Sequence, residues 1–554
     1  MTTNVCIIGG GVAGVGAWWC LSQPDQPGYE WNVTLLHNAA SLGGHAWTVP
    51  VPFKGQTVNV DTGVQFYAPL LYRNIDAILA RPEFSTVLTQ PYDGLKVGCG
   101  FPRAAGAMQN WGNMPDYGAT DTTKTPGSPF ALYSPTMWAD AVMFQDAVDA
   151  SLLGGLSQTM DQYFAANAGE YQDLATFQSM FLAPYLSIIN GYGAALMDQV
   201  TFGDLLPLFG SLGSGSPWPG LARFTEPSQG FTRFVDGATS FVEAMAASAA
   251  QNKPGATVTY NAGVTAVYPQ GQAAVVEWTD ANGSHSQSFD KVIITTDMQA
   301  TSSILAAKGT AWSSLYEQYI CPLATQLLPG YCMVHTDPSV LSPDLTEGEE
   351  TVQFTAYYAG DDTQPGDYNL FLTYTTYLQG NIHSECDAAG LYLTMYGYVP
   401  EGVPEPVRPS NPCNAGPIAQ YPSKIPVQNT VLFQEYWTHG MWLPQFMLAE
   451  KRAMHMAQGP GNISYQGQSP YPIYFAGNNL TADSLEHAFL SGAIIADYAF
   501  GAPLPVLDNI PAALMYELFK VEFMFPNPTS VGAATPDVSA RQAEILLHAL
   551  TSPT

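Results

Sequence analysis

Basic residues are scarce in this sequence, and their scarcity limits the partners of the protein. The 554 residues include 17 Lys and Arg against 46 Asp and Glu, which gives a net charge of −29. A surface with this excess of negative charge repels nucleic acid and anionic lipid headgroups. No run of basic residues interleaved with aromatics offsets the repulsion. We therefore expect a small-molecule partner and no nucleic acid.

Membrane-spanning runs and metal-binding patterns are also missing. No apolar stretch reaches about 20 uninterrupted residues, the length that crosses a bilayer. The first residues, MTTNVCIIGG, lack the basic region of a secretory signal peptide. The seven Cys are scattered, without metal-ligand spacing or an evident disulfide framework. We expect no integral membrane segment, no metal site and a cytoplasmic location; secretion and a homodimer are left open.

What the sequence does contain is a glycine-rich turn directly after a short apolar run. Residues 5–8 read as a buried strand, and Gly9, Gly11 and Gly14 then fit the pattern G-x-G-x-x-G. The first glycine permits a tight turn, the second lets a pyrophosphate approach the backbone, and the third lets the following helix pack closely. A second strand over residues 31–37 completes a βαβ unit, so the pattern predicts a dinucleotide site.

The end of the second strand departs from the usual form of such sites. An Asp or Glu normally binds the ribose there, about 20 residues beyond the glycines. This chain has His37 followed by Asn38. An imidazole nitrogen or an amide oxygen can still bond a ribose hydroxyl, but without a full negative charge. We expect both residues to contact the adenosine half of the ligand, and the alternative is that His37 is only a strand-end residue.

The next two segments identify the dinucleotide through a resemblance. The stretches SLGGHAWTV (41–49) and VNVDTGVQFY (58–67) are similar to those of the flavin amine oxidase and phytoene desaturase superfamily, most of all a predicted NAD/FAD-binding subgroup with a GGH turn. The resemblance implies that Gly43 and Gly44 wrap an FAD pyrophosphate. It implies that Asp61 and Gly63 lie near the flavin, and that His45 stands where the family usually has Arg.

Later segments continue the same resemblance in the expected order. Residues 229–249 look like the family's glycine-containing lead into a helix, and Val264 matches a residue that contacts the adenine side through its backbone. The segment 472–498 resembles the closing flavin motif, in which Gly477 matches the family's glycine and Asn478 stands in place of an acid.

A helix with an apolar face should follow this closing motif. Asp483 or Ser484 can cap its start, immediately before Leu485. The positive end of the helix would then point towards the flavin.

The segments that carry the resemblance cover under half of the chain. We expect an α/β fold: a Rossmann-like FAD-binding domain with an inserted α+β substrate domain of mixed sheet plus helices. The first insert has a loop over 103–136 and helical patterns over 138–165 and 172–190, and the second insert reads as strands. The expected division is a discontinuous FAD-binding domain of 1–70, 220–300 and 428–505, a substrate domain of 71–219 and 301–427, and a C-terminal extension of 506–554.

The chemistry follows from the flavin that the resemblance implies. We expect an FAD-dependent oxidoreductase that removes hydride from a hydrophobic amine, polyunsaturated fatty acid or polyene. A redox-neutral double-bond isomerase, as in the related polyenoic fatty acid isomerases, and a non-catalytic flavin-binding protein are the alternatives. Family members often place aromatic residues near the flavin from the region of QEYWTHGMW, so Tyr436, Trp437 and His439 are the candidate catalytic residues.

Overall fold

The computed structural model describes most of the chain in segments. They are residues 2–23, 30–67, 69, 72–92, 97–102, 108–112, 135–151, 155, 158–182, 200–202, 205, 231–309, 326–338, 352–358, 370–377, 390–395, 398–400, 423–425, 427–441, 472–477 and 484–520.

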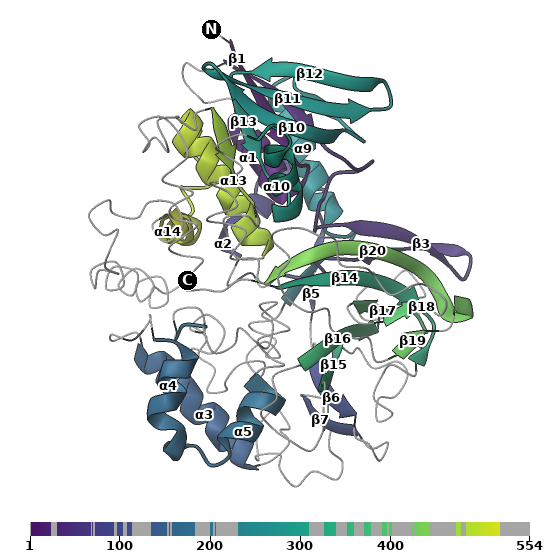
Figure 1. Cartoon of the computed structure of the whole chain (residues 1–554), viewed down its shortest axis with the longest axis vertical. Helices are drawn as coiled ribbons and strands as arrows, with labels where there is room; N and C mark the ends of the chain where they lie inside the picture. Colours follow the sequence, from purple (N-terminus) through teal and green to yellow (C-terminus); the bar gives the residue numbers. More distant parts are fainter. Residues whose placement is uncertain are drawn as a thin grey trace.

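The part that holds the glycine turns is a parallel sheet covered by helices, as the sequence predicts (Figure 1). Strand β1 pairs in parallel with β13 on one side and β2 on the other. Both faces of such a sheet are buried, which is why β1 ends in a continuous apolar run. The strand order is β21 (Ile473–Phe475), β13 (Lys291–Ile294), β1 (Thr2–Ile8), β2 (Glu30–Leu36) and β9 (Thr257–Thr259).

Helix α1 (Val12–Leu21) is the centre of this part, and all of its residues are buried. It packs against α9 (Thr239–Asn252) and α13 (Leu485–Phe500), so the helix is apolar all round. The crossing of α1 and α13 is close: a Cβ added at Gly492 would overlap the Ala13 carbonyl oxygen. The first glycine turn and the last predicted motif are thereby fixed to one another. Helices α2 (Arg73–Leu79), α10 (Met298–Ala306) and α14 (Ile510–Phe519) complete this region.

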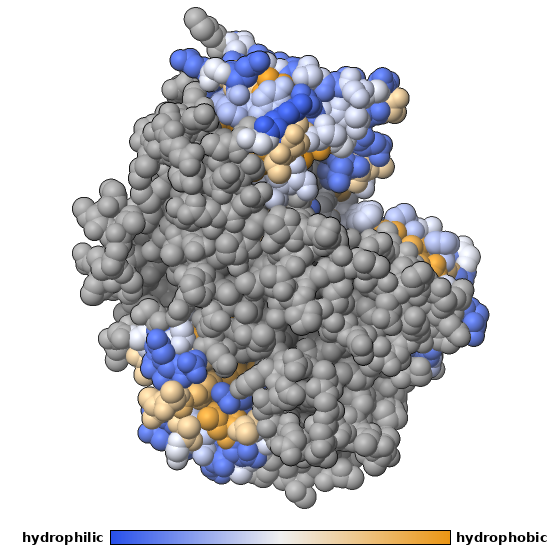
Figure 2. Space-filling view, viewed as in Figure 1, coloured by the Kyte–Doolittle hydropathy of each residue, from blue (hydrophilic) through white to orange (hydrophobic). Residues whose placement is uncertain are grey.

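An antiparallel three-stranded meander follows β9 in the chain. It consists of β10 (Gly263–Gln270), β11 (Ala273–Asp280) and β12 (Gly283–Phe289). The side chains of β12 are mostly exposed and polar, and Figure 2 shows a mainly hydrophilic surface over this sheet.

A seven-stranded sheet joins the two predicted inserts. Strands β15 to β17 lie where aromatic-rich strands were expected, and β6 of the first insert pairs with β15. Strand β7 lies inside the predicted loop of 103–136, so that expectation was wrong for residues 108–112; pairing with β6 supplies their hydrogen bonds. The order is β20 (Thr430–Met441), β14 (Gln326–His335), β17 (Tyr392–Met395), β16 (Leu370–Tyr377), β15 (Val352–Tyr358), β6 (Val97–Pro102) and β7 (Met108–Gly112).

The hairpin of β3 (Thr48–Phe53) and β4 (Gln56–Asp61) connects this sheet with the parallel one. Its Val58 and Val60 share an apolar cluster with Val334 and Leu393 of the seven-stranded sheet. Two short pairs, β5 (Thr89–Tyr92) with β8 (Phe231–Phe234) and β18 (Tyr398–Pro400) with β19 (Ser423–Ile425), complete the strands.

The helical part of the first insert is a separate aromatic core, at the lower left of Figure 1. It is built from α3 (Pro135–Ala150), α4 (Met160–Asn167) and α5 (Leu174–Phe177). The Phe144 ring stacks on Phe164 at a centroid distance of 5.5 Å. The helical pattern predicted over 138–165 is broken, because Thr159 starts α4 with a capping box.

Candidate cofactor site

The first glycine turn connects β1 to α1 at the carboxyl end of the parallel sheet. Gly11 is the N-cap of α1, with φ −80° and ψ −179°, and no side chain caps the helix. The first turn of α1 also carries no acidic residue. Its backbone N–H groups and the positive end of the helix dipole are therefore available to an anion.

The structure explains the presence of glycine differently at each of the three positions of the pattern. Gly9 has φ +114°, and a Cβ there would lie 2.5 Å from Thr295 Oγ1. A Cβ at Gly14 would overlap the Gly9 carbonyl oxygen. At Gly11 the nearest atoms to an added Cβ are Gly44 Cα at 3.7 Å and Gly43 O at 3.9 Å, which is ordinary contact. The fold requires glycine at positions 9 and 14, but packing within the chain would admit a Cβ at position 11. The glycine at 11 is instead explained by the dinucleotide pattern, in which a pyrophosphate approaches the backbone there.

The second glycine turn faces the first. The Gly43 N–H donates to the Gly10 carbonyl oxygen at 2.9 Å, and Gly43 and Gly11 form an isolated β-bridge. Gly43 and Gly44 have φ of +137° and +58°, which glycine adopts without strain. The structure thus brings together Gly11, Gly43 and Gly44, and their binding of a pyrophosphate stays a prediction. His45 is half-buried beside them, and its contact with a cofactor stays a prediction.

At the end of β2 the two predicted ribose contacts point in different directions. His37 is buried, and both of its ring nitrogens are engaged: Nδ1 accepts from the Gly10 N–H at 3.1 Å, and Nε2 lies 2.7 Å from the Ser41 carbonyl oxygen. Asn38 is exposed. Val264 lies near this strand end, because the N–H of Ala262 donates to the His37 carbonyl oxygen at 2.8 Å.

Asp61 at the end of β4 holds the start of α9. Its Oδ1 accepts from Thr48 Oγ1 at 2.6 Å and from the Ala238 N–H at 2.9 Å. Burial raises the pKa of Asp61 to about 7, against the lowering effect of these hydrogen bonds. Asp61 therefore fastens the hairpin to the helix that follows. Gly63 lies half-buried two residues further on, and the nearness of both residues to a flavin stays a prediction.

The closing motif lies at the same edge of the sheet. Gly477 follows β21 with φ +90°, and its N–H donates to Ser491 Oγ at 2.7 Å. Ser484 is the N-cap of α13, because its Oγ accepts from the His487 N–H at 3.0 Å; this confirms one of the two predicted caps. Leu485 begins the helix and is buried. Asn478 lies outside the described residues.

Glu486, next to this cap, is a buried carboxylate that was not among the predicted site residues. Oε1 accepts from the backbone N–H and the side-chain amide of Asn74, each at 2.8 Å, and Oε2 accepts from the Ile75 N–H at 3.0 Å. Asn74 and Ile75 belong to the first turn of α2. The only sign of Glu486 in the sequence is an acidic residue in the first turn of α13. That position does not indicate that its carboxylate caps the start of another helix, α2.

The three candidate catalytic residues lie on β20. The pairing of β20 with β14 shifts register between Pro329 and Tyr331. Tyr436 and Trp437 form a bulge there, because both lie opposite the single residue between Pro329 and Tyr331. His439 pairs with Leu328 beyond this bulge. Bulges are frequent next to active sites because they redirect side chains. The assignment of these residues to catalysis stays a prediction.

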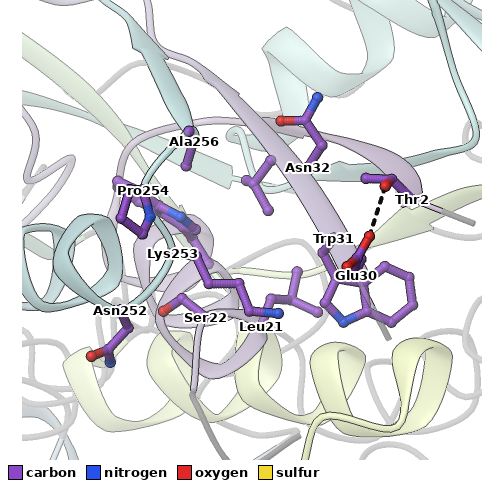
Figure 3. Close-up of a pocket in the computed structure, with 13 residues that line it drawn as sticks. Thr2, Leu21, Ser22, Glu30, Trp31, Asn32, Asn252, Lys253, Pro254 and Ala256 are labelled. Carbon is purple, nitrogen blue, oxygen red and sulfur yellow. Dashed lines mark hydrogen bonds between the residues drawn. The ribbon is translucent and has the colours of Figure 1, made fainter. Parts of the chain in front are cut away.

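A depression of about 420 Å³ lies at the opposite end of the parallel sheet (Figure 3). It is lined by Thr2 and Glu30, at the amino ends of β1 and β2, and by Lys253 after α9. Thr2 Oγ1 donates to Glu30 Oε2 at 3.0 Å across its edge. Ligands of open parallel sheets bind at the carboxyl ends of the strands, so this depression is not part of the cofactor site.

Two further features are absent from the described part of the chain. No group of three or more His, Cys, Asp or Glu side chains could hold a metal ion there. Within the same residues, no helix is both long and apolar enough to cross a bilayer.

Solved structures with the same fold include enzymes of several activities. A CLA-producing fatty acid isomerase from P. acnes and a putrescine oxidase bound to putrescine each have TM-score 0.50 and 14% identity, and each match covers 90% of this chain and 98% of the other. An oxidoreductase from Methanosarcina mazei has TM-score 0.50 and 12% identity, over 89% of this chain and 100% of the other. At these identities the likeness shows the fold alone.

A search of curated proteins found no significant match. A family model does match: that of flavin-containing amine oxidoreductases, over residues 25–328, which is more than half of the chain. The matched range begins after the first glycine turn, includes the second one at Gly43 and Gly44, and ends before α13, and it confirms the resemblance seen in the sequence. The chain belongs to the flavin-containing amine oxidoreductase family and is a flavin-dependent oxidoreductase by that membership.

Proposed function

We propose that the protein binds FAD, non-covalently and one per chain, and uses it to remove hydride from a hydrophobic organic substrate. The observation that carries the cofactor assignment is the glycine at position 11, which packing within the chain does not require and which faces Gly43 and Gly44 of the second glycine turn. A nicotinamide dinucleotide would need only the first turn. The second glycine turn and the closing helix α13 favour FAD, because both lie at the same edge of the sheet.

The residues of this chain would bind and orient the cofactor. The backbone N–H groups at the start of α1 and in the second glycine turn would hold the pyrophosphate. The Ser484-capped start of α13 would direct the positive end of that helix into the site. The flavin, when bound, supplies the hydride acceptor, and the two electrons taken from the substrate pass on to oxygen or another acceptor.

The substrate class is inferred from the second insert. Strands β15, β16 and β17 are rich in Tyr, Phe and Thr, and they share one sheet with β20 and its bulge. Strands of this aromatic, weakly charged composition suit a site for an amine with a hydrophobic body, a polyunsaturated fatty acid or a polyene. A redox-neutral isomerase is the second candidate function, because the fatty acid isomerase from P. acnes has the same fold as this chain.

Anaerobic spectroscopy separates these functions. The purified protein is mixed without oxygen with a diamine, a polyunsaturated fatty acid or a carotenoid, and the flavin absorbance and the products are followed. An oxidase or dehydrogenase bleaches and yields a substrate oxidised by two electrons. An isomerase yields a product of unchanged mass with displaced double bonds, over many turnovers, and leaves the flavin oxidised at the end. If no substrate class gives bleaching or a product, the proposed hydride chemistry on these substrates is wrong.

The identity of the cofactor is tested separately by acid precipitation. FAD in the supernatant, at one per chain, is the expected result. A flavin that stays with the precipitated protein would contradict non-covalent binding, and recovery of a nicotinamide dinucleotide would contradict the assignment of FAD.

A further inference from the structure

We propose that His37 is a positioning residue whose neutral ring holds the two glycine turns together, while Asn38 takes the ribose of the cofactor. The proposal rests on the proposed FAD site and assigns separate tasks to the two residues that replace the usual ribose-binding acid. Both hydrogen bonds of the imidazole ring go to the two glycine turns, one to Gly10 and one to Ser41.

The hydrogen bonds of His37 determine its protonation state. The Ser41 carbonyl oxygen can only accept, so the Nε2 atom that lies 2.7 Å from it must carry the hydrogen. The Gly10 N–H can only donate, so Nδ1, at 3.1 Å, must be the acceptor. One neutral tautomer satisfies both contacts. Neither ring nitrogen is then left for a ribose hydroxyl.

The ring is a link between two loops that lie far apart in the sequence. Gly10 belongs to the first turn, and Ser41 leads into the second. Leu42 and the His37 ring close over Gly10: a Cβ added there would lie 2.6 Å from Leu42 Cδ2 and 2.8 Å from His37 Cγ. Together with the hydrogen bond from the Gly43 N–H to the Gly10 carbonyl oxygen, the imidazole sets the distance between the turns that would hold the pyrophosphate.

A carboxylate at position 37 does not fit this arrangement. It could accept from the Gly10 N–H, but its second oxygen would face the Ser41 carbonyl oxygen, and two acceptors repel. The direction of that carbonyl group therefore explains why the chain has histidine where an acid is usual. Asn38, one residue later, is exposed at the carboxyl end of the strand. Its amide oxygen can accept from a ribose hydroxyl, and its NH₂ group can donate to one.

Protonation of His37 would break the link, because a hydrogen on Nδ1 would face the Gly10 N–H. Burial lowers the pKa of His37 below its usual range, and the Ser41 carbonyl group acts in the opposite direction. Among the described residues, the hydrogen-bond partners of His37 are Gly10, Ser41, Thr259 and Ala262, and none of them is charged. The link should therefore be intact at pH 7 and open only on acidification.

The test is the FAD affinity of the full-length apoprotein between pH 8 and pH 5, measured by quenching of flavin fluorescence. For the wild type we expect a constant Kd from pH 8 to 7. At lower pH the Kd should rise, towards about tenfold per pH unit below the pKa of the ring. His37→Gln keeps an acceptor and a donor without a titrating group. It should bind within about threefold of the wild type at pH 8 and should lack this acid-induced weakening.

Two further variants separate the two tasks. His37→Ala should raise Kd about tenfold at pH 8, because both links are lost. Asn38→Ala should raise Kd by a similar factor but keep the wild-type dependence on pH. Circular dichroism at each pH checks that the variants are folded. The comparison with His37→Gln also removes the contribution of Asp61, which titrates near pH 7 in both proteins.

The outcomes distinguish this inference from the proposed function. Parallel pH profiles for the wild type and His37→Gln, or an unchanged Kd in His37→Ala, would overturn the role of His37. An unchanged Kd in Asn38→Ala would overturn the role of Asn38. A wild-type apoprotein that does not bind FAD at pH 8 would instead overturn the FAD assignment itself.

Discussion

Replacing Glu486 should change both the stability of the protein and the dependence of that stability on pH. Its carboxylate is 1% exposed and accepts three hydrogen bonds from Asn74 and Ile75 at the start of α2. Glu486 itself lies in the first turn of α13. One side chain therefore fixes the start of α2 to the start of the helix that closes the cofactor site.

The expected magnitudes follow from these contacts. Glu486→Ala leaves the two backbone N–H groups and the Asn74 amide buried without their acceptor, which should cost about 3–5 kcal/mol of the free energy of unfolding. Glu486→Gln keeps one acceptor oxygen but turns an NH₂ group towards the Ile75 N–H. It should cost about 1–3 kcal/mol at pH 5.

The pH dependence has a definite sign. Burial raises the pKa of Glu486 from 4.5 to about 7 in the folded protein, although the hydrogen bonds and the helix start favour the charged form. The folded state then holds the proton more tightly than the unfolded state. The group stabilises the protein at low pH, and the contribution is lost as the pH rises towards 7. Between pH 5 and pH 8 the loss amounts to about 2–3 kcal/mol.

Urea unfolding of the wild type and both variants at pH 5, 6, 7 and 8, followed by circular dichroism, measures these quantities. From pH 5 to pH 8 the wild type should lose about 2–3 kcal/mol of stability relative to Glu486→Gln, so the difference seen at pH 5 should vanish or change sign. Parallel curves for these two proteins would refute a carboxyl group that titrates near pH 7. An alanine variant as stable as the wild type would refute the cap itself.

The remaining predictions concern the elements around the site. Ser484→Ala removes the N-cap of α13 and should lower the free energy of unfolding by about 1 kcal/mol, seen as a lower urea midpoint; an unchanged midpoint would contradict the cap. Gly492→Ala would overlap the Ala13 carbonyl oxygen, so we expect little folded protein, and a normal yield would show that the helix crossing can relax. Asp61→Asn keeps an acceptor oxygen but removes a carboxyl group whose pKa burial raises from 3.8 to about 7. The free energy of unfolding should therefore fall less from pH 5 to pH 8 than it does in the wild type, and an equal fall would contradict the raised pKa of Asp61.

The sequence alone predicted the features that depend on neighbouring residues. The turn at Gly9–Gly14, the strands before and after it and the cap at Ser484 each follow from a few consecutive residues, and the structure has them. Strand β7 was missed because residues 108–112 lie in a stretch rich in Gly, Pro, Ser and Thr, and their strand conformation depends on pairing with β6, which is in turn held by β15 more than two hundred residues later.

The roles of His37 and Glu486 depend on the three-dimensional structure in the same way. The partners of Glu486 lie 412 and 411 residues away in the sequence, so no local pattern reveals them. From the sequence alone, His37 stands where an acid usually binds the ribose, so restoring an acid in His37→Glu would be expected to strengthen FAD binding. The orientation of the Ser41 carbonyl group reverses this expectation, because it places an acceptor where the new carboxylate would lie.

The flavin content of Gly11→Ala decides whether the glycine turns bind FAD. Gly11 has backbone angles open to any residue, and an added Cβ meets no atom of the chain closer than 3.7 Å. Gly169→Ala, at a position with nothing within 4 Å, is the matched control. If the space beside Gly11 holds the FAD pyrophosphate, Gly11→Ala will purify folded, with the melting temperature of the wild-type apoprotein but little flavin, while the control carries one FAD per chain. A folded Gly11→Ala variant with as much flavin as the control would contradict the account.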